Sequence, residues 1–496
     1  MRRYFRHGGG ATLSGLLLAT ALSGCMVGPN YTTPKTTLSL YHNLDAASAL
    51  QKQPAPPIDL WWEGFNDPML VTVVQQALDQ NLDLQAALAR VQQARAVASG
   101  AGAALLPTVD LDASSTYTHQ SLNGAFGSVS QGSPGFHRNG AEDVVGPSAS
   151  WEIDLFGGLR KSSRAAQEEF QAAEADQAAT RVTVAADAAD AYLQVRGYQA
   201  RLAVAANQIA TDQQLVTLVQ TRYAAGASSD REVAQAQALL QQAQASVPPL
   251  RYALEVQLNR LDVLMGAQPG TYARELAVVR DIPAVPAIPT NQQPVDLLRR
   301  RPDVIGAERR LAASNEQIGA AISDYYPKIS LSGALGFDSL SANQFLTGNA
   351  FTAAGGGALH WRIFDFGKVD AEVAQARGAN AEALADYRQS VLRATEDVED
   401  SLSGFTQTQA HVVELQAEVQ SLTKARDYAL QDYQAGSITL TDVLDADSQL
   451  LTAQDELDAN RADAARSAVG VYRAFGGGWD PAPQNFALAT TRLPGS

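Results

Sequence analysis

Hydrophobic positions recur along this chain with two different periods. In two long segments an apolar or aromatic side chain returns every seventh residue: Val195, Leu202, Ile209, Val216 and Tyr223 in the first, and Val391, Val398, Phe405, Val412 and Val419 in the second. A seven-residue repeat is typical of α-helices that pack side by side as a coiled coil. The first helix could run from Leu159 to Tyr223, which is about 95 Å at about 1.5 Å per residue. The alternative is a plain solvated coiled coil, in which the helices enclose no lumen.

The second period is two, and it predicts short β-strands. Alternation is seen in two segments: Val109, Leu111 and Ala113, then Ile329, Leu331 and Gly333. Alternation over about ten residues is a weak signature of a membrane β-strand. We expect strands at about 108–118 and 146–156, and again at about 328–337 and 356–366. The segments between them are small, polar and rich in turn-forming residues, as in exposed loops.

The two halves of the chain are copies of one another. Four features recur at an offset of 210 residues: WEIDLFG at 151–157 as WRIFDFG at 361–367, Tyr223 as Tyr433, Gly226 as Gly436, and Gly266 as Gly476. Upstream, Leu106-Pro107 matches Tyr326-Pro327 at an offset of 220. The first copy therefore has about ten more residues between its strands, which belong in a surface loop. Each copy reads as a β-hairpin followed by a long helical hairpin.

This repeat divides the chain into five predicted parts. They are a signal peptide at 1–24, a lipid-anchored segment with the first repeat at 25–266, a proline-rich connector at 267–294, the second repeat at 295–478, and a tail at 479–496. Within the repeats, the helical hairpins are expected at about 159–264 and 369–475. Five prolines in the connector favour an extended segment.

The first residues have the composition of a secretory signal. Arg2, Arg3 and Arg6 precede an apolar run at 11–21 that is too short to span a bilayer. Leu-Ser-Gly-Cys then resembles the bacterial lipobox, in which the thiol, here of Cys25, receives a diacylglycerol. An ordinary signal peptide followed by a free thiol is the alternative. Met26 rather than an aspartate follows the cysteine, which favours the outer membrane.

Charge and composition exclude several classes of function. Removal of residues 1–24 takes away three arginines and no acid, so the formal net charge falls from −15 to −18. Such an acidic chain does not bind nucleic acid through phosphate contacts. Of the six histidines, the five beyond the predicted signal peptide are scattered without metal-ligand spacing: His42, His119, His137, His360 and His411. With no phosphate loop or nucleophile elbow either, we expect neither an enzyme nor a cofactor or metal, apart from the lipid on Cys25.

The predicted strands pose a problem that one chain cannot solve. Four strands cannot close a barrel, and an open edge in lipid leaves backbone groups unpaired at several kcal/mol each. If the strands span a membrane, copies of the chain must share one barrel, and their number stays open. A soluble four-stranded sheet that caps a helical protein is the alternative.

The ends of the two helical hairpins carry matching signals. Gly226 and Gly436 lie where a glycine commonly ends a helix, and capping boxes follow at Ser229–Glu232 and Thr439–Asp442. Asp442 and Asp445 are three residues apart and share one helix face. Capping accounts for Asp442, whereas Asp445 lies a turn further in and needs another reason, or is merely solvated.

Four motifs complete the pattern: CMVGPNY at 25–31, WWEGFNDPML at 61–70, LLRRRPDV at 297–304 and AFGGGW at 474–479. With the repeat, they resemble the outer membrane factor (TolC) family, and more closely its lipidated OprM and NodT-type branch. The resemblance implies a homotrimer whose twelve-stranded β-barrel continues as a periplasmic α-helical barrel. It implies an exit channel for solutes expelled by an inner-membrane pump, of the RND type, through a periplasmic adaptor. A lipid-anchored coiled-coil scaffold or adaptor without a pore is the alternative.

The resemblance also implies residues for the pore and its gate. Asp442 and Asp445 would form two rings of carboxylates that make a closed entrance cation-selective. Tyr433 matches a gate tyrosine, and Glu232 matches an acid on the neighbouring hairpin. Ile438 stands where the family has an arginine, and Arg231 is a candidate for the missing cationic partner.

Overall fold

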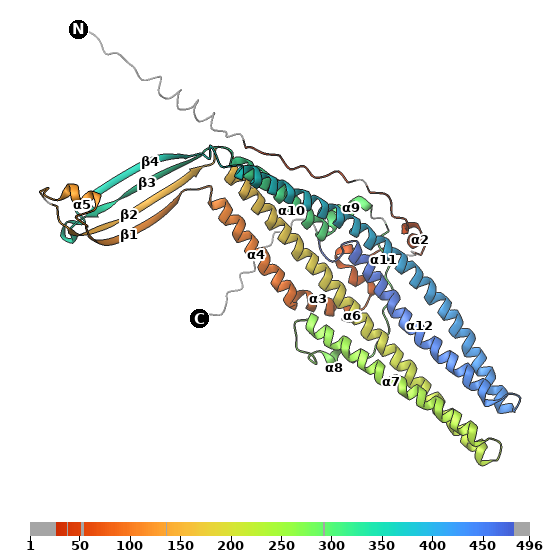
Figure 1. The fold of residues 1–496 in the computed structure, drawn as a ribbon. Coiled ribbons are helices and arrows are strands. Elements are labelled where there is room, and N and C mark those ends of the chain that lie inside the picture. Colours follow the sequence, from red (N-terminus) through yellow and green to blue (C-terminus); the bar gives the residue numbers. More distant parts are fainter. Residues whose placement is uncertain (1–25, 37, 51–53, 135, 291–292, 481–496) are drawn as a thin grey trace, which may run out of the picture. The chain divides into compact units, whose positions relative to one another are not determined.

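The computed structural model describes residues 26–36, 38–50, 54–134, 136–290 and 293–480. The predicted signal peptide, Cys25 and residues 481–496 of the tail lie outside them. Helices dominate the described residues (Figure 1). Among these residues, no helix combines the length and the apolar character needed to cross a membrane.

Elements follow the order of the repeat. The first half contains α2 Leu44–Ala49, the 3₁₀ helix η1 Ile58–Phe65, α3 Pro68–Gln80, α4 Leu82–Ala103, β1 Thr108–His119, α5 Ala125–Ser130, β2 Asn139–Ile153, α6 Gly158–Ala224 and α7 Asp230–Leu264. The second contains α8 Ala273–Leu276, α9 Pro294–Arg300, α10 Pro302–Ser323, β3 Lys328–Ser339, η2 Ala342–Gln344, β4 Phe351–His360, α11 Lys368–Ala435 and α12 Leu440–Ala474.

The two β-hairpins join into one antiparallel sheet in the order β1-β2-β3-β4 (Figure 1). Within the hairpins, Thr108 lies opposite Ser150, and Lys328 lies opposite His360. Between them, Trp151 of the first repeat lies opposite Leu331 of the second. Strands β1 and β4 are therefore the two edges of the sheet.

The second strand of each hairpin differs from its predicted range. β2 begins at Asn139 rather than at about 146, because it pairs with the whole of β1 as far as His119. The range 356–366 was wrong at both ends, since β4 spans Phe351–His360. Its partner β3 begins at Lys328, opposite His360, and offers no backbone groups to residues beyond that point.

The long helices bury most of their seven-residue pattern. In α6, Val195 and Val216 are buried and Leu202 and Ile209 half-buried, whereas Tyr223 near the helix end is 45% exposed. In α11 three positions are buried and two half-buried: Val391, Val398 and Phe405, then Val412 and Val419. The return helix α7 continues through Pro248 and Pro249, which lack the N–H groups for its hydrogen bonds.

The described chain forms two compact units that do not coincide with the two repeats. The first comprises the described residues up to 34, with 92–172 and 308–386, and contains the sheet. The second comprises 35–91, 173–307 and the residues from 387 onward, and contains the helical hairpin ends. Each unit takes segments from both repeats, so neither repeat is an independent domain.

Three of the motifs meet inside the second unit. The Trp61 ring stacks on Tyr472 at 5.5 Å between centroids, and both are fully buried. A Cβ on Gly478 would lie 3.5 Å from Trp61 Nε1, so these two motifs are in contact. The guanidinium of Arg300 donates to the Trp479 carbonyl at 2.8 Å, which joins the third motif to them. These motif residues build the core rather than a chemical site.

The fourth motif lies in the first unit. A Cβ on Gly28 would lie 2.4 Å from the Cα of Gly319, so only glycine fits this approach. The carbonyl of Pro29 accepts a hydrogen bond at 2.9 Å from the fully buried Lys161, which also pairs with Glu316 at 2.9 Å. The segment that follows Cys25 is thereby fixed to α6 and α10.

Candidate gate at the helical hairpin ends

Both helical hairpins turn at a glycine in the left-handed conformation. Gly226 has φ +74° and Gly436 has φ +80°. After each glycine the next N–H reaches back to a helix carbonyl, from Ala227 to Arg222 at 2.8 Å and from Ser437 to Asp432 at 2.9 Å. These bonds satisfy carbonyls left unpaired at the helix ends.

The return helices begin with the capping boxes that the sequence predicts. The N–H of Ser229 donates to Glu232 at 2.8 Å, and the N–H of Thr439 donates to Asp442 at 2.9 Å. The Thr439 hydroxyl also donates to Asp442 at 2.7 Å and, as the largest influence, holds the pKa of that carboxyl below its usual range. Hydrogen bonds led by that from Ser228 lower the pKa of Glu232 in the same way.

An apolar cluster joins the two hairpins just behind their turns. Its buried members come from all four long helices: Leu215, Val216, Val219, Ala236, Leu239, Tyr433, Leu440 and Val443. Ile438, in the turn between α11 and α12, packs against this cluster and is partly buried. A charged side chain at that position would have to leave the cluster or be paired within it.

The predicted gate residue Tyr433 is 3% exposed and lies beneath an arginine that the sequence reading did not single out. The Arg222 guanidinium lies 4.5 Å from the centre of the Tyr433 ring and donates to the Tyr433 carbonyl at 3.0 Å. Burial is the main cause that raises the pKa of the Tyr433 hydroxyl. The sequence does single out Arg222 in one way. It aligns with Asp432 of the second repeat, so the charge just before the turn differs between the two repeats.

The other predicted gate residues are not gathered in a single chain. Asp442 and Asp445 are both exposed on α12, and Arg231 is exposed at the start of α7. Glu232 is engaged by Ser228 at 2.7 Å rather than by the tyrosine. Within one chain, the cation that contacts Tyr433 is therefore Arg222.

A buried pair of carboxyl groups connects α6 with α12 one level behind the apolar cluster. Asp212 is fully buried and Asp447 is 2% exposed. The Gln208 amide donates to both, at 2.8 Å to Asp212 and 2.6 Å to Asp447, and Arg426 Nε lies 3.2 Å from Asp447. Burial first, and then the hydrogen bond and charge of Asp447, raise the pKa of Asp212 to about 7. Asp212 therefore takes up a proton as the pH falls below about 7, beside an Asp447 carboxylate that faces Arg426.

Sequence spacing could have found this pair. Leu440, Val443, Asp447 and Leu450 follow the i, i+3, i+7 and i+10 spacing of one helix face, and all four are buried. Asp447 thus lies on the packed face of α12, whereas Asp442 and Asp445 lie on its exposed side. Of the three clustered aspartates, one is a cap, one is solvated and one is part of the core.

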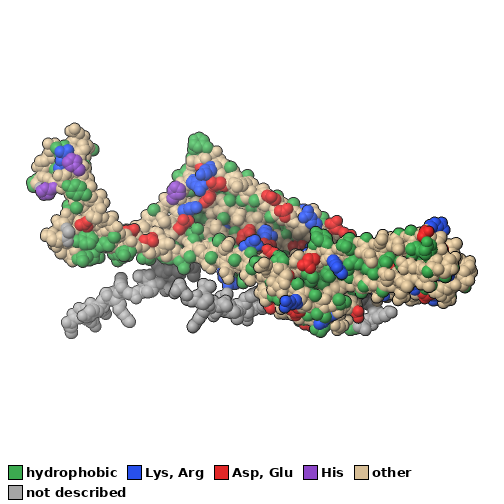
Figure 2. Space-filling view, turned by 90° about the horizontal axis from the view of Figure 1, so that it is seen from below, with side chains coloured by type: hydrophobic (Ala, Val, Ile, Leu, Met, Phe, Trp, Pro, Cys, Tyr) green, Lys and Arg blue, Asp and Glu red, His purple; other side chains and the backbone are tan. Residues whose placement is uncertain are grey.

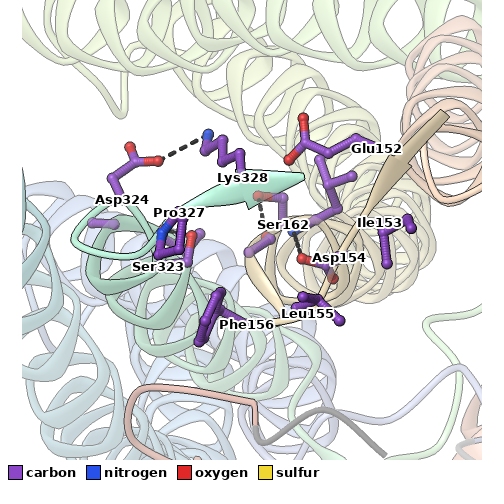
Figure 3. A pocket seen from close by; sticks show the side chains of 14 residues that line it. Glu152, Ile153, Asp154, Leu155, Phe156, Ser162, Ser323, Asp324, Pro327 and Lys328 are labelled. Atoms are coloured by element: carbon purple, nitrogen blue, oxygen red, sulfur yellow. Dashed lines mark hydrogen bonds and ion pairs between the residues drawn. The ribbon is translucent and has the colours of Figure 1, made fainter. Parts of the chain in front are cut away.

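A polar cavity of about 260 Å³ lies where the sheet meets the helices of the first unit (Figure 3). Asp154 accepts from the N–H groups of Leu159 and Arg160 at the start of α6, at 3.1 and 2.9 Å. Asp324 pairs with Lys328 at 2.9 Å. These contacts assign Asp154 to helix capping, and Asp324 and Lys328 to an ion pair.

Charge on the described surface is mixed rather than sorted. On the face seen in Figure 2, acidic and basic side chains are interspersed over the helices. No group of histidine, cysteine, aspartate and glutamate side chains in the described part of the chain has the geometry to hold a metal ion.

Comparison with known proteins defines the class. The sequence profile of the outer membrane efflux proteins matches residues 73–267 and 294–477. The chain therefore belongs to this family: it is an outer-membrane protein of efflux and not an enzyme.

Individual relatives are similar along nearly their whole length. The pyoverdine export outer membrane protein OpmQ of Pseudomonas aeruginosa is 33% identical, over 88% of this chain and 91% of its own. Nodulation protein T of Rhizobium leguminosarum bv. trifolii is 29% identical, over 93% and 96%. Among solved structures, the outer-membrane channel OprN matches with a TM-score of 0.84 and 33% identity, over 92% of this chain and all of that one. The CmeC channel of Campylobacter jejuni matches with a TM-score of 0.84 and 26% identity, over 93% and 96%.

Proposed function

We propose that this protein is the outer-membrane exit channel of a tripartite efflux system. Three chains contribute four strands each to a twelve-stranded barrel, which continues as an α-helical barrel in the periplasm. The observation that carries the proposal is the four-stranded sheet with two open edges, in a chain of the outer membrane efflux protein family. Such edges require partners in lipid.

The proposal includes a lipid anchor on Cys25. Support comes from the next residues: the N–H of Val27 donates to the Phe156 carbonyl at 3.1 Å, and a Cβ on Gly157 would lie 2.2 Å from Met26 Cγ. The lipid would start beside the junction of β2 and α6, where Trp151 is exposed. Tryptophans commonly lie at the membrane interface, so anchor and barrel would meet the same leaflet.

The proposed partners are a periplasmic adaptor and an inner-membrane pump of the RND type. The pump selects and drives the solute, and the channel conducts it passively. Relatives are named for pyoverdine export and for solvent and toluene efflux, which indicates that one architecture serves chemically different cargo. We therefore propose small solutes as the cargo class and assign no binding site for them to this chain.

At the periplasmic end, Asp442 and Asp445 would form two acidic rings around the axis. Their exposure in the single chain supports this placement, because it leaves both carboxylates accessible to ions. The Arg222 contact with Tyr433 would hold the two hairpins of each chain together in the closed state.

The test is single-channel conductance of the purified protein in a planar bilayer, combined with gel mobility before and after boiling. A shared barrel should give discrete conductance events and an oligomer that resists detergent until it is heated. A periplasmic scaffold would give neither, and that result would overturn the proposal.

A further inference from the structure

The sheet has two open edges, and the internal repeat specifies what covers them. Within one chain β2 of the first repeat pairs with β3 of the second. Their equivalents in the other repeat are β4 and β1, the two edges. We propose that β4 pairs antiparallel with β1 of a second copy in the register inherited from β2 and β3, and that Phe366 docks on Leu106 of that copy. The inference rests on the proposed channel, whose barrel needs such a seam.

The repeat fixes the register of the seam. In the chain, Trp151 lies opposite Leu331 and Ile153 opposite Ile329. The second strands of the two repeats are offset by 210 residues and the first strands by 220. Transferred by these offsets, Trp361 lies opposite Leu111 of the second copy, and Ile363 lies opposite its Val109. Apolar side chains therefore meet apolar ones on one face of the seam.

The side chains of the other face agree with this register, although they played no part in deriving it. His360 falls opposite Asp112 of the second copy, and Arg362 falls opposite its Asp110. A slip of two residues in either direction leaves only one of the two basic residues opposite an aspartate, and a slip of one residue exchanges the faces of the strand. Arg362 already lies 3.0 Å from Glu372 and 3.4 Å from Asp324 in its own chain, so Asp110 would join an existing ion pair. An acid directly across a sheet from a cation is favourable and helps to set the register.

The junction below the strands gives a third observation. Phe156 stacks on Tyr326 with 4.6 Å between ring centres, a contact between the two repeats. The equivalent residues are Phe366 and Leu106, which are 91% and 65% exposed. Phe366 also has φ +57°, a conformation that is unusual for a bulky residue and that persists only where its surroundings impose it. The second copy would provide those surroundings.

The two junctions are locally alike, which justifies the transfer. Trp151 Nε1 donates to the Leu105 carbonyl at 3.0 Å, and Trp361 Nε1 donates to the Tyr325 carbonyl at 2.9 Å. These are equivalent contacts at the same offsets of 210 and 220 residues. Phe156 has its partner Tyr326 within the chain, whereas Phe366 does not stack on the equivalent Leu106 of its own chain and both are exposed.

The missing neighbour of the edge strand also explains why β4 ends earlier than β2. β2 continues to Ile153 because β3 pairs with it that far, whereas β4 stops at His360. The missing residues are Trp361 to Ile363, which would face Val109 to Leu111 of the second copy. On assembly β4 should therefore extend by three residues, to the length that its counterpart β2 already has.

Paired cysteines test the register in outer membranes that contain the full-length protein. Leu359→Cys with Ala113→Cys places the two thiols directly opposite each other, within the reach of a disulfide. Mild oxidation should give a ladder of cross-linked chains that a reductant removes. Leu359→Cys with Tyr117→Cys is the matched control, displaced by four residues or about 13 Å. Leu359→Cys alone, which retains Cys25, should give no ladder.

The outcomes separate this inference from the proposed channel. If the displaced pair cross-links as well as the first pair, or the single variant cross-links, the register is wrong. An unboiled oligomer on the gel would still support the channel in that case. If no variant cross-links and no oligomer is present, the seam and the channel both fail.

Discussion

At the scale of single residues, the three aspartates of the stretch GSITLTDVLDADS separate by environment. A carboxylate that caps a helix is stabilised in its charged form, and one buried against another carboxyl is stabilised in its protonated form. Asp442 is of the first kind, with its pKa lowered by the Thr439 hydroxyl. Asp447 is buried with Asp212, whose pKa rises to about 7. One short sequence thus carries an exposed capping carboxylate and a buried carboxylate that faces Arg426, a few residues apart.

The Asp212 pair predicts a pH dependence of stability. The folded pKa lies above the unfolded value of 3.8, so between these values the folded state holds a proton that the unfolded state lacks. This contribution to the free energy of unfolding is present at low pH and is lost as pH rises through about 7. Asp212→Asn keeps a neutral partner for Asp447 at every pH. It should raise stability at pH 8 relative to the native chain by about 1–3 kcal/mol.

Thermal unfolding at pH 5 and pH 8 measures this effect. The native chain should lose more stability between the two values than Asp212→Asn does. Asp445→Asn, an exposed change on the same helix as Asp447, is the control and should keep the native pH dependence. Equal slopes in the native chain and Asp212→Asn would rule out a raised pKa at Asp212.

Arg222 gives a second prediction at this scale. Its contact with the buried Tyr433 ring and its bond to the Tyr433 carbonyl link α6 to α11 beside the turns. Arg222→Gln should weaken this link by about 1–2 kcal/mol, since both a cation–π contact and a charged hydrogen bond are lost. Amide hydrogen exchange in 433–440 should accelerate, and the channel should open more often in bilayers. Arg231→Gln, which removes an exposed charge from the other side of the turn, should change neither.

At the scale of elements, the sequence was most informative where a pattern is local. Glycine turns and capping boxes depend on a few neighbouring residues, and both hairpin ends have the predicted form. The seven-residue pattern predicted long helices with buried positions, and α6 and α11 have them. Strand β4 was misplaced because the end of a strand depends on its neighbour, which lies elsewhere in the sequence. Arg222 was missed for the same reason, since its partner is 211 residues away.

Gly436 tests the turn of the second hairpin as an element. A Cβ at this position meets nothing within 4 Å, so only its φ of +80° opposes substitution. Gly436→Ala should therefore destabilise the turn by about 1 kcal/mol. Gly404 in α11 is a matched control, because its Cβ would also meet nothing within 4 Å but its backbone is helical. Gly404→Ala should be neutral or stabilising by up to about 1 kcal/mol. Chemical unfolding of the two variants should give opposite signs, and a shared sign would contradict this account.

At the scale of the whole molecule, the repeat is what connects one chain to an assembly. The same contacts occur inside the chain between repeats and, in our proposal, between chains. The Phe156 contact with Tyr326 is complete, and its equivalent at Phe366 is open. Sequence periodicity predicted the repeat, yet it left the number of copies undetermined because two, three or more chains can each close a ring of strands.

The proposed acidic rings give the prediction that belongs to the assembled channel. Rings of Asp442 and Asp445 would concentrate cations at the entrance, so Asp442→Asn with Asp445→Asn should lower the cation-to-anion permeability ratio by about twofold or more. Reversal potentials in a gradient of dilute salt report this ratio, because the rings are screened less at low ionic strength. Asp442 also caps α12, so the loss of a cap must be separated from the loss of a ring. Glu232→Gln neutralises the equivalent capping carboxylate of α7, as Asp442→Asn does for α12, while leaving both rings intact. If the rings set selectivity, the double variant shifts the reversal potential and Glu232→Gln does not; unchanged potentials in the double variant would place the two aspartates away from the conducting path.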